Sequence, residues 1–183
     1  MSFILMQQEA DALLAMEKHY SGAERFTYPS LGGVLRIPLH SVAMREEFNL
    51  DITRGRIELK KNTFQLRAHR AIVLARIDIG GAPHRNPDGE EMPCPHLHVY
   101  REGHGDKWAI PLPNQFSNST NTWQILHEFM DYCAVITKPI ILQEDSHDWR
   151  DQYITRKIYA VAQRQNHCQT DLRRLGRNNH SLH

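Results

Sequence analysis

Residues 48–79 read FNLDITRGRIELKKNTFQLRAHRAIVLARIDI, and this stretch carries the clearest secondary-structure pattern in the 183-residue chain. Apolar and polar residues alternate over 48–53 and again over 64–69, as expected where successive side chains of a strand point to opposite faces. The run 72–79 is more continuously apolar, which indicates a more deeply buried strand. The stretch therefore predicts three successive strands of one sheet.

Turn sequences separate these strands. Residues 54–55 and 60–62 form turns on either side of a short apolar pair, Ile57 and Leu59, and the glycines at 80–81 end the third strand. Each segment is short, and the spacing from one strand to the next is about ten residues.

Four shorter segments extend this pattern. Strands are predicted at 34–39, 96–100, 108–110 and 140–142, and Pro38 favours an edge position for the first of them. Regularly spaced short strands with turns between them are typical of an antiparallel meander, which is either curled or closed as a small barrel.

The N-terminal segment has helical periodicity. Met6, Ala10, Leu13 and Leu14 recur at the spacing of one helix face, which predicts a helix running to about Tyr20. The Ser-Gly pair that follows is a common helix end.

Two further helices are predicted after the strands. Asn121, with Gln124 three residues later, resembles a capping box for a helix whose apolar stripe runs over 123–133. Asp148 is expected to cap a last helix with an apolar stripe over 154–162.

Together these elements predict one α+β domain over residues 1–183. It is an antiparallel β-meander or small barrel, flanked by an N-terminal helix and two C-terminal helices. The polar, basic tail from about 171 to 183 is expected to fray.

Composition excludes several classes of protein. Hydrophobic residues make up 40% of the chain and charged residues 23%, which is typical of a soluble globular protein and not of a disordered one. The three cysteines (Cys94, Cys133 and Cys168) are odd in number and lack C-x-x-C spacing, so a disulfide framework is not expected. Because no signal peptide or membrane-spanning segment is apparent, we expect a cytoplasmic protein without a membrane partner.

The net charge of +1 conceals an asymmetry. From Arg150 onward, seven Lys and Arg residues accompany only two Asp residues. Such a basic segment is either an electrostatic footprint for nucleic acid or an acidic partner, or a solvated helix face with a frayed tail.

The most informative cluster of polar residues lies in the predicted strand HLHVY. Alternation places His96, His98 and Tyr100 on one face, opposite to Leu97 and Val99. A polar row of this kind on an otherwise apolar strand predicts a functional site.

Metal binding is one interpretation of this row. His96, His98 and Glu102 have the H-x-H-x₃-E spacing that resembles the metal-binding pattern of cupins, and imidazole and carboxylate groups suit Fe, Mn, Ni or Zn. His69 and His84 are available to complete the set of ligands.

Metal-free acid/base cleavage of RNA is a second interpretation. The imidazoles of His96 and His98 can act as base and acid because their pKa lies near neutrality, and Tyr100 can position the phosphate. Arginine binds phosphate through two parallel hydrogen bonds. The expected substrate-binding residues are His84, Arg85 and Arg101.

A purely structural interpretation also stands. Polar residues on one face of a half-solvated sheet need no function, and the NPDG sequence at 86–89 is an ordinary turn. Arg76 and Asp78, two residues apart on a buried strand, either pair for structural reasons or belong to the site, and we favour the structural pair.

Four motifs resemble an uncharacterised bacterial and phage family. They are LARIDI at 74–79, HRNPDG at 84–89, PHLHVY at 95–100 and DKWA at 106–109, and the match covers roughly residues 46–133. The family shares an R-x-D, H-x-N-P-D-G, H-x-H-x-Y series. More distantly, the arginine strand, the Asn/Asp/Pro loop and the histidine pair resemble toxins of the TumE kind from toxin–antitoxin pairs.

The shared strand face of His96, His98 and Tyr100, together with the basic C-terminal segment, leads to the hypothesis of a nucleic-acid-acting protein. The leading form of this hypothesis is a toxin-like, metal-independent ribonuclease. Its catalytic residues are expected to be His96, His98 and Tyr100, with no cofactor. The expected partner is RNA, or a protein such as an antitoxin. The alternatives are a non-enzymatic phage or plasmid inhibitor that binds a host defence complex, and a cupin-like metal-binding protein.

Overall fold

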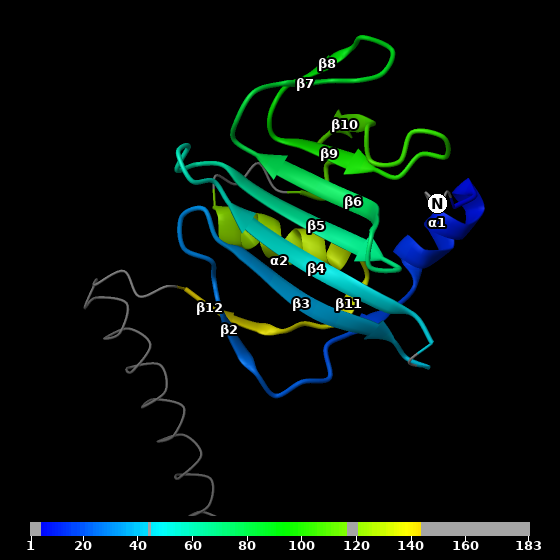
Figure 1. The fold of residues 1–183 in the computed structure, drawn as a ribbon, viewed down its shortest axis with the longest axis vertical. Helices are drawn as coiled ribbons and strands as arrows, with labels where there is room; N and C mark the ends of the chain where they lie inside the picture. Colours follow the sequence, from blue (N-terminus) through cyan, green and yellow to red (C-terminus); the bar gives the residue numbers. More distant parts are fainter. Residues whose placement is uncertain (1–4, 44, 117–120, 144–183) are drawn as a thin grey trace, which may run out of the picture. The chain divides into compact units, whose positions relative to one another are not determined.

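An eight-stranded sheet is the centre of the fold, with the strand order β10-β9-β6-β5-β4-β3-β1-β11 (Figure 1). The computed structural model describes residues 5–43, 45–116 and 121–143. Neighbouring strands are antiparallel, except that β1 and β11 are parallel. The strands of this sheet are β1 (Lys18–His19), β3 (Val34–Ser41), β4 (Glu47–Arg54), β5 (Asn62–Ala68), β6 (Ile72–Ile79), β9 (His96–Val99), β10 (Ala109–Pro111) and β11 (Val135–Thr137).

Two helices and two small strand pairs complete the described part of the chain. The helices are α1 (Gln7–Ala15) and α2 (Thr122–Tyr132). β2 (Arg25–Thr27) pairs in parallel with β12 (Ile140–Leu142), and β7 (His84–Arg85) forms a hairpin with β8 (Glu91–Met92). This hairpin lies in the loop that joins β6 to β9 (Figure 1).

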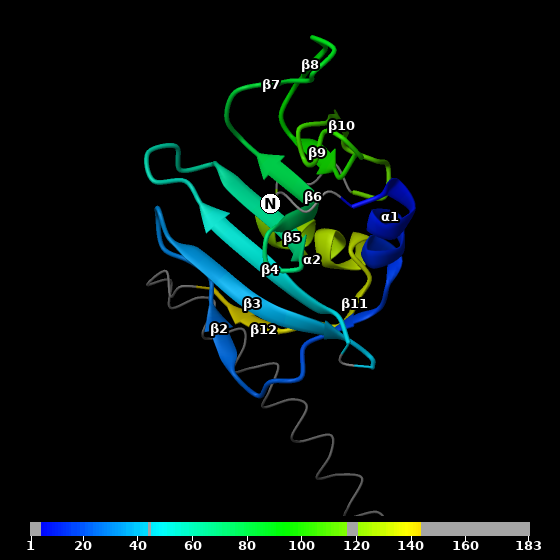
Figure 2. The same ribbon diagram turned by 45° about the vertical axis from the view of Figure 1, so that its right-hand side comes forward.

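The two faces of the sheet differ because apolar and polar residues alternate. In β5, Phe64 and Leu66 are fully buried, whereas Gln65 and Arg67 between them are only half-buried. Helix α2 packs behind the sheet on the apolar face, where Phe129 lies 6.3 Å from Phe64 between ring centroids (Figures 1 and 2). The opposite face of these central strands is therefore polar.

Directly paired residues form a polar row across this second face. Arg36 of β3 pairs with Asp51 of β4, which pairs with Gln65 of β5. The row continues through Arg76 of β6 to His98 of β9. It leads from the middle of the sheet to β9, the strand that carries His96 and His98.

The prediction of three strands over 48–79 is confirmed by β4, β5 and β6. The apolar pair Ile57 and Leu59 lies in the loop between β4 and β5, and the side chain of Ile57 is 93% exposed. The sheet is open, with β10 and β11 at its two ends, so it is not the closed barrel that we considered.

Two predicted boundaries are also corrected. Helix α1 ends at Ala15 instead of near Tyr20, because Met16 adopts an extended conformation and the chain enters β1. β3 is not an edge strand, but β1 pairs with it only at residues 40–41, so Pro38 lies where β3 has a hydrogen-bonding neighbour on one side alone.

The described residues belong to one compact unit that spans Met1–Glu144. The helix predicted after Asp148 and the basic tail at 171–183 lie outside the described residues. In the described part, neither helix is long and apolar enough to cross a membrane.

Candidate metal centre

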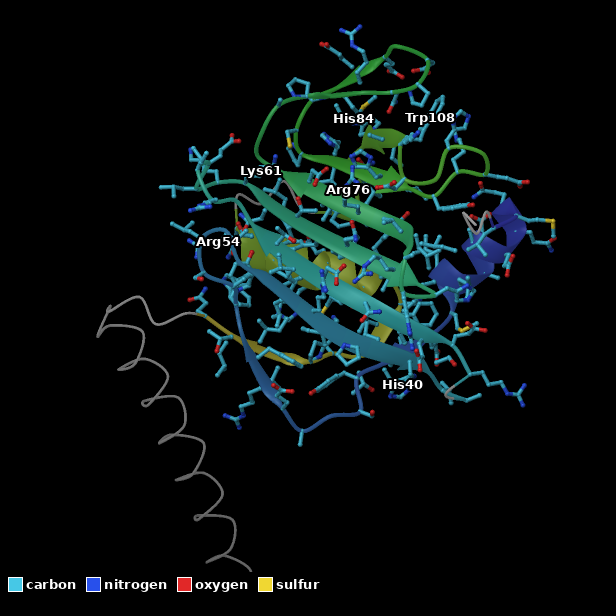
Figure 3. All side chains as sticks on the ribbon, in the orientation of Figure 1. His40, Arg54, Lys61, Arg76, His84 and Trp108 are labelled. Carbon is cyan, nitrogen blue, oxygen red and sulfur yellow. The ribbon has the colours of Figure 1, made fainter. Side chains whose placement is uncertain are left out.

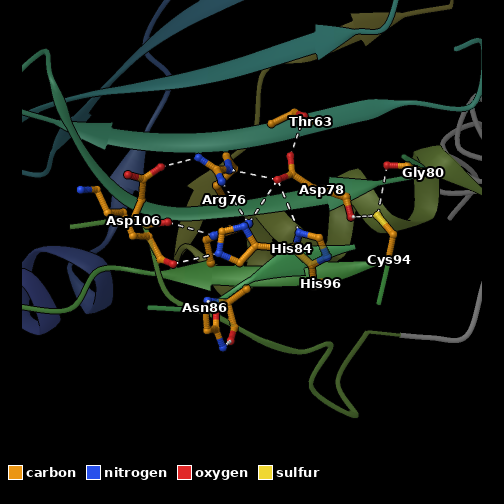
Figure 4. Close-up of polar contacts among 12 residues, drawn as sticks. Thr63, Arg76, Asp78, Gly80, His84, Asn86, Cys94, His96 and Asp106 are labelled. Carbon is orange, nitrogen blue, oxygen red and sulfur yellow. Dashed lines mark hydrogen bonds and ion pairs between the residues drawn. The ribbon is translucent and has the colours of Figure 1, made fainter. Parts of the chain in front are cut away.

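The antiparallel register of β6 and β9 builds the site. Asp78 lies directly opposite His96, and Arg76 lies directly opposite His98. Residues that face each other in this way have their Cβ atoms about 5 Å apart, so their side chains meet. Figure 4 shows Arg76, Asp78 and His96 close together.

Three groups that can bind a metal converge here. The Oδ2 atom of Asp78 lies 3.2 Å from His98 Nε2 and 3.7 Å from His96 Nε2. The three potential ligand atoms all lie within 4.8 Å of one another. Both histidines are buried, whereas 21% of the Asp78 side chain is exposed, so Asp78 is the most solvent-exposed of the three residues.

Backbone carbonyls orient both imidazoles. The Nδ1 atom of His98 donates to the Asp106 carbonyl at 2.9 Å, and that of His96 donates to the Pro93 carbonyl at 3.2 Å. Since a carbonyl oxygen only accepts, the proton is held on Nδ1, and each neutral ring directs an Nε2 lone pair toward Asp78. Metal-binding histidines in proteins are commonly oriented by a hydrogen bond of this kind.

This arrangement requires a positive charge. A neutral His98 ring and the Asp78 carboxylate would place two hydrogen-bond acceptors only 3.2 Å apart. Because their lone pairs repel each other, the contact needs either a proton on the ring or a cation that lies next to both atoms. Arg76 supplies such a charge. Its Nη2 donates to His98 Nε2 at 3.0 Å and its Nε donates to Asp78 Oδ2 at 3.2 Å, while Nη1 is bound by the carboxylate of Asp106.

The protonation of the cluster suits metal binding. Burial raises the pKa of Asp78, but its close contacts with His98 and Thr63 and the charge of Arg76 outweigh this effect and hold the pKa well below its usual range. Burial lowers the pKa of His96, so this ring is neutral at pH 7. A carboxylate and a neutral imidazole are the forms that bind metals.

His84 covers the two buried histidines. Its ring centroid lies 4.5 Å from that of His98 and 5.8 Å from that of His96, and its Nε2 donates to the Lys107 carbonyl at 2.9 Å. Figure 3 shows His84 and Arg76 at the β6–β9 side of the sheet, away from His40. Among the described residues, His84 is therefore the imidazole best placed to add a ligand at this site.

All of these residues lie within a single match to a known protein family. Residues 5–135 match a family described as a family of unknown function, DUF6978. The chain belongs to this family. No curated protein and no solved structure matches the chain. Nothing in these comparisons confirms the resemblance to TumE-like toxins or the predicted motif series.

In this DUF6978 chain, the other residues predicted for the site lie outside the cluster. The hydroxyl of Tyr100 is bound by the backbone of Leu5, accepting from its N–H and donating to its carbonyl, each at 2.9 Å. The guanidinium of Arg101 stacks on Trp108, 3.8 Å from the ring centroid. These contacts give Tyr100 and Arg101 structural partners.

Arg85, Glu102 and His69 also point elsewhere. Arg85 forms an exposed ion pair with Glu91 on the β7–β8 hairpin, 2.7 Å between Nη2 and Oε1. Glu102 accepts from the backbone N–H of Gln7 at 2.8 Å, so the carboxylate that joins the two histidines in the candidate metal centre is Asp78 and not Glu102. His69 lies 3.1 Å from Glu46, at the other end of β5.

Proposed function

We propose that this DUF6978 chain binds one divalent transition-metal ion through Asp78, His96 and His98 and uses it for hydrolysis. The observation that supports the proposal is the convergence of the three ligand atoms, with both imidazoles oriented by backbone carbonyls. Two histidines and one carboxylate form a common ligand set for catalytic zinc and for non-haem iron.

The number of ligands favours catalysis over a purely structural metal. Structural zinc sites usually have four protein ligands, whereas catalytic sites have three and leave a position for water or substrate. A metal at such a site lowers the pKa of its bound water to near 7, which makes a hydrolytic nucleophile available. The partly exposed side chains of Asp78, Arg76 and Asp106 provide the access that a substrate needs.

Metal-independent cleavage of RNA by His96 and His98 is the second candidate. The proximity of two imidazoles and an arginine favours it. However, His96 is 2% exposed and His98 is fully buried, and both are covered by His84. A phosphodiester could not reach their Nε2 atoms without an opening of the site, and we therefore prefer the metal-dependent proposal, with RNA retained as a proposed substrate.

Metal analysis of the tag-free protein tests the proposal. We expect about one equivalent of Zn, Fe, Mn or Ni in the wild type, and its loss in Asp78→Asn and His98→Gln, because each variant removes one of three ligands. Glu102→Gln is the matched control, since this carboxylate lies outside the cluster. Metal-free wild-type protein that also fails to take up added zinc would overturn the proposal, as would equal metal contents in all variants.

RNA digestion separates the two candidates. Under the metal proposal, a chelator abolishes any cleavage and added metal restores it. Cleavage that persists in chelator but disappears in His98→Gln would favour the metal-independent ribonuclease. If a variant with both His96 and His98 replaced keeps its biological activity, this would instead favour the non-enzymatic inhibitor, which acts by binding alone.

A further inference from the structure

Arg76 occupies the place where a metal ion would bind. Its Nη2 donates to His98 Nε2, which carries the only lone pair of the neutral ring, at 3.0 Å. Its Nε donates to Asp78 Oδ2 at 3.2 Å. A nitrogen lone pair cannot accept a hydrogen bond and coordinate a metal at the same time. The guanidinium and a divalent ion are therefore mutually exclusive at His98 Nε2. Asp78 Oδ2 has further lone pairs, but there the two cations would lie side by side and repel each other.

We infer that metal binding displaces Arg76 from His98 and Asp78, and that the released guanidinium binds an anionic oxygen group of the substrate beside the ion. This inference rests on the proposed function. It assigns to the site a ligand class, phosphoryl or carboxylate, and it assigns to Arg76 the role of an anion-binding residue.

Asp106 keeps the displaced guanidinium near the site. Its carboxylate binds Nη1, on the side of the guanidinium away from the nitrogen that contacts Asp78, and 32% of its side chain is exposed. When the contacts of Arg76 with His98 and Asp78 are lost, the contact with Asp106 holds the guanidinium at the solvent edge of the cluster. The planar fork of arginine suits two parallel hydrogen bonds to an oxyanion.

The balance of charge also favours an anion. With neutral histidines, the carboxylates of Asp78 and Asp106 and the guanidinium of Arg76 give the cluster a charge of −1. A divalent ion changes this charge to +1 and places two cationic groups next to each other. An anionic ligand that bridges them removes their repulsion.

Cobalt and phosphate titrations test the inference, because the visible spectrum of Co²⁺ reports on its ligands. We expect Arg76→Gln to bind Co²⁺ at least about tenfold more tightly than the wild type, because the competing cation is gone. The cobalt-loaded variant should bind inorganic phosphate at least about tenfold more weakly than the cobalt-loaded wild type. Acetate titrations in parallel show whether the site prefers a carboxylate.

Two variants make the comparison specific. Arg36→Gln is the matched control, because Arg36 lies in the same polar row with 71% of its side chain exposed, and it should leave both affinities unchanged. Arg76→Lys keeps the charge but not the two-nitrogen fork, so its affinities should lie between those of the wild type and Arg76→Gln. It also serves if Arg76→Gln does not fold.

The outcomes separate this inference from the proposed function. Wild-type protein that binds no Co²⁺ overturns the metal site itself. A second outcome is that the wild type binds Co²⁺ and that the Arg76 variants have the same affinities for Co²⁺, phosphate and acetate as the wild type. The metal site then stands and the role of Arg76 is overturned. In the wild type alone, phosphate and Co²⁺ should strengthen each other's binding by the same factor, and independent binding contradicts the inference.

Discussion

At the scale of single residues, Asn86 joins the β7–β8 hairpin to the edge strand β10. Its Nδ2 donates to the Ala109 carbonyl at 2.9 Å, and its Oδ1 accepts from the Ala109 N–H at 2.8 Å. Both contacts are buried, so the amide of Asn86 satisfies two backbone groups that water does not reach. The hairpin that carries His84 is thereby fixed above the histidine pair.

Replacement of Asn86 should destabilise the fold. Asn86→Ala leaves a buried donor and a buried acceptor unpaired, and we expect the free energy of unfolding to fall by about 2–4 kcal/mol. Asn86→Asp should lower the free energy of unfolding further, because a carboxylate oxygen would face the Ala109 carbonyl oxygen. Urea denaturation measures both, with the exposed Asp88→Ala as control. Equal stability of Asn86→Ala and Asp88→Ala would show that the two hydrogen bonds contribute little.

Tyr100 gives a second residue-scale prediction. Because its hydroxyl is bound by Leu5, Tyr100→Phe should lower the free energy of unfolding by about 1–3 kcal/mol while leaving metal affinity unchanged. Chemical denaturation and a metal titration of the same variant provide the two measurements. A loss of metal affinity without a loss of stability would return Tyr100 to the functional site.

The residues of the site were only partly predictable from sequence. Alternation along a strand correctly places His96 and His98 on one face, because it depends on local geometry alone. The contribution of Asp78 depends on which residues of β6 face which residues of β9, and alternation within one strand contains no such information. The signal that could have found it is the matching spacing of R-x-D and H-x-H on two strands joined by a single loop.

At the scale of elements, a buried lysine connects the C-terminal ends of both described helices. The ammonium of Lys18 donates to the carbonyls of Leu14, Met16 and Cys133 at 2.9, 2.7 and 3.0 Å, and it lies 4.7 Å from the ring centroid of Phe48. The last carbonyls of a helix have no partner within the helix. One fully buried side chain therefore serves the ends of α1 and α2 at once.

Removal of this ammonium should weaken the whole arrangement. Lys18→Met leaves one buried and two partly buried carbonyls without their donor, and we expect a loss of about 3 kcal/mol in the free energy of unfolding. The exposed Lys60→Met is the matched control and should change stability by less than about 0.5 kcal/mol. A Lys18→Met protein as stable as this control would contradict the structural role.

The same lysine predicts a dependence of stability on pH. Burial lowers the pKa of Lys18 from 10.5 to about 8 in the folded protein. Between these values the unfolded chain holds a proton that the folded chain has released, so a rise in pH favours the folded state. The stability of the wild type relative to Lys18→Met should be constant below pH 7 and rise between pH 8 and 10.5. Denaturation curves at several pH values measure it, and a constant difference throughout would contradict it.

Element boundaries were predictable where strands are long. β4, β5 and β6 each contain seven or eight residues, enough for the alternation to be recognised. β1 has two residues and β11 has three, and their pairing joins segments more than a hundred residues apart. Such short strands are determined by tertiary packing, including the burial of Lys18, and not by a local pattern.

At the scale of the whole molecule, metal binding and folding should be coupled. The ligands come from two strands and are brought together only in the folded sheet, so a ligand of the folded state stabilises it. At a free metal concentration of about 100 times the Kd, this effect is about 2.7 kcal/mol. Thermal unfolding should therefore shift upward with added zinc and downward with a chelator. Asp78→Asn should show neither shift, and identical melting of the wild type in both conditions would contradict the coupling.

The β7–β8 hairpin separates the two ligand-bearing strands in sequence but does not set their register, which is held by the pairing of β6 with β9 along its length. Changes at the tip of this hairpin that spare Asn86 and Pro93 should therefore leave the proposed metal ligands in place. Relatives that share the ligands could diverge in what they admit to the site through this loop alone. For protein engineering, the tip of the β7–β8 hairpin is therefore a suitable position at which to change access to the site without changing Asp78, His96 or His98.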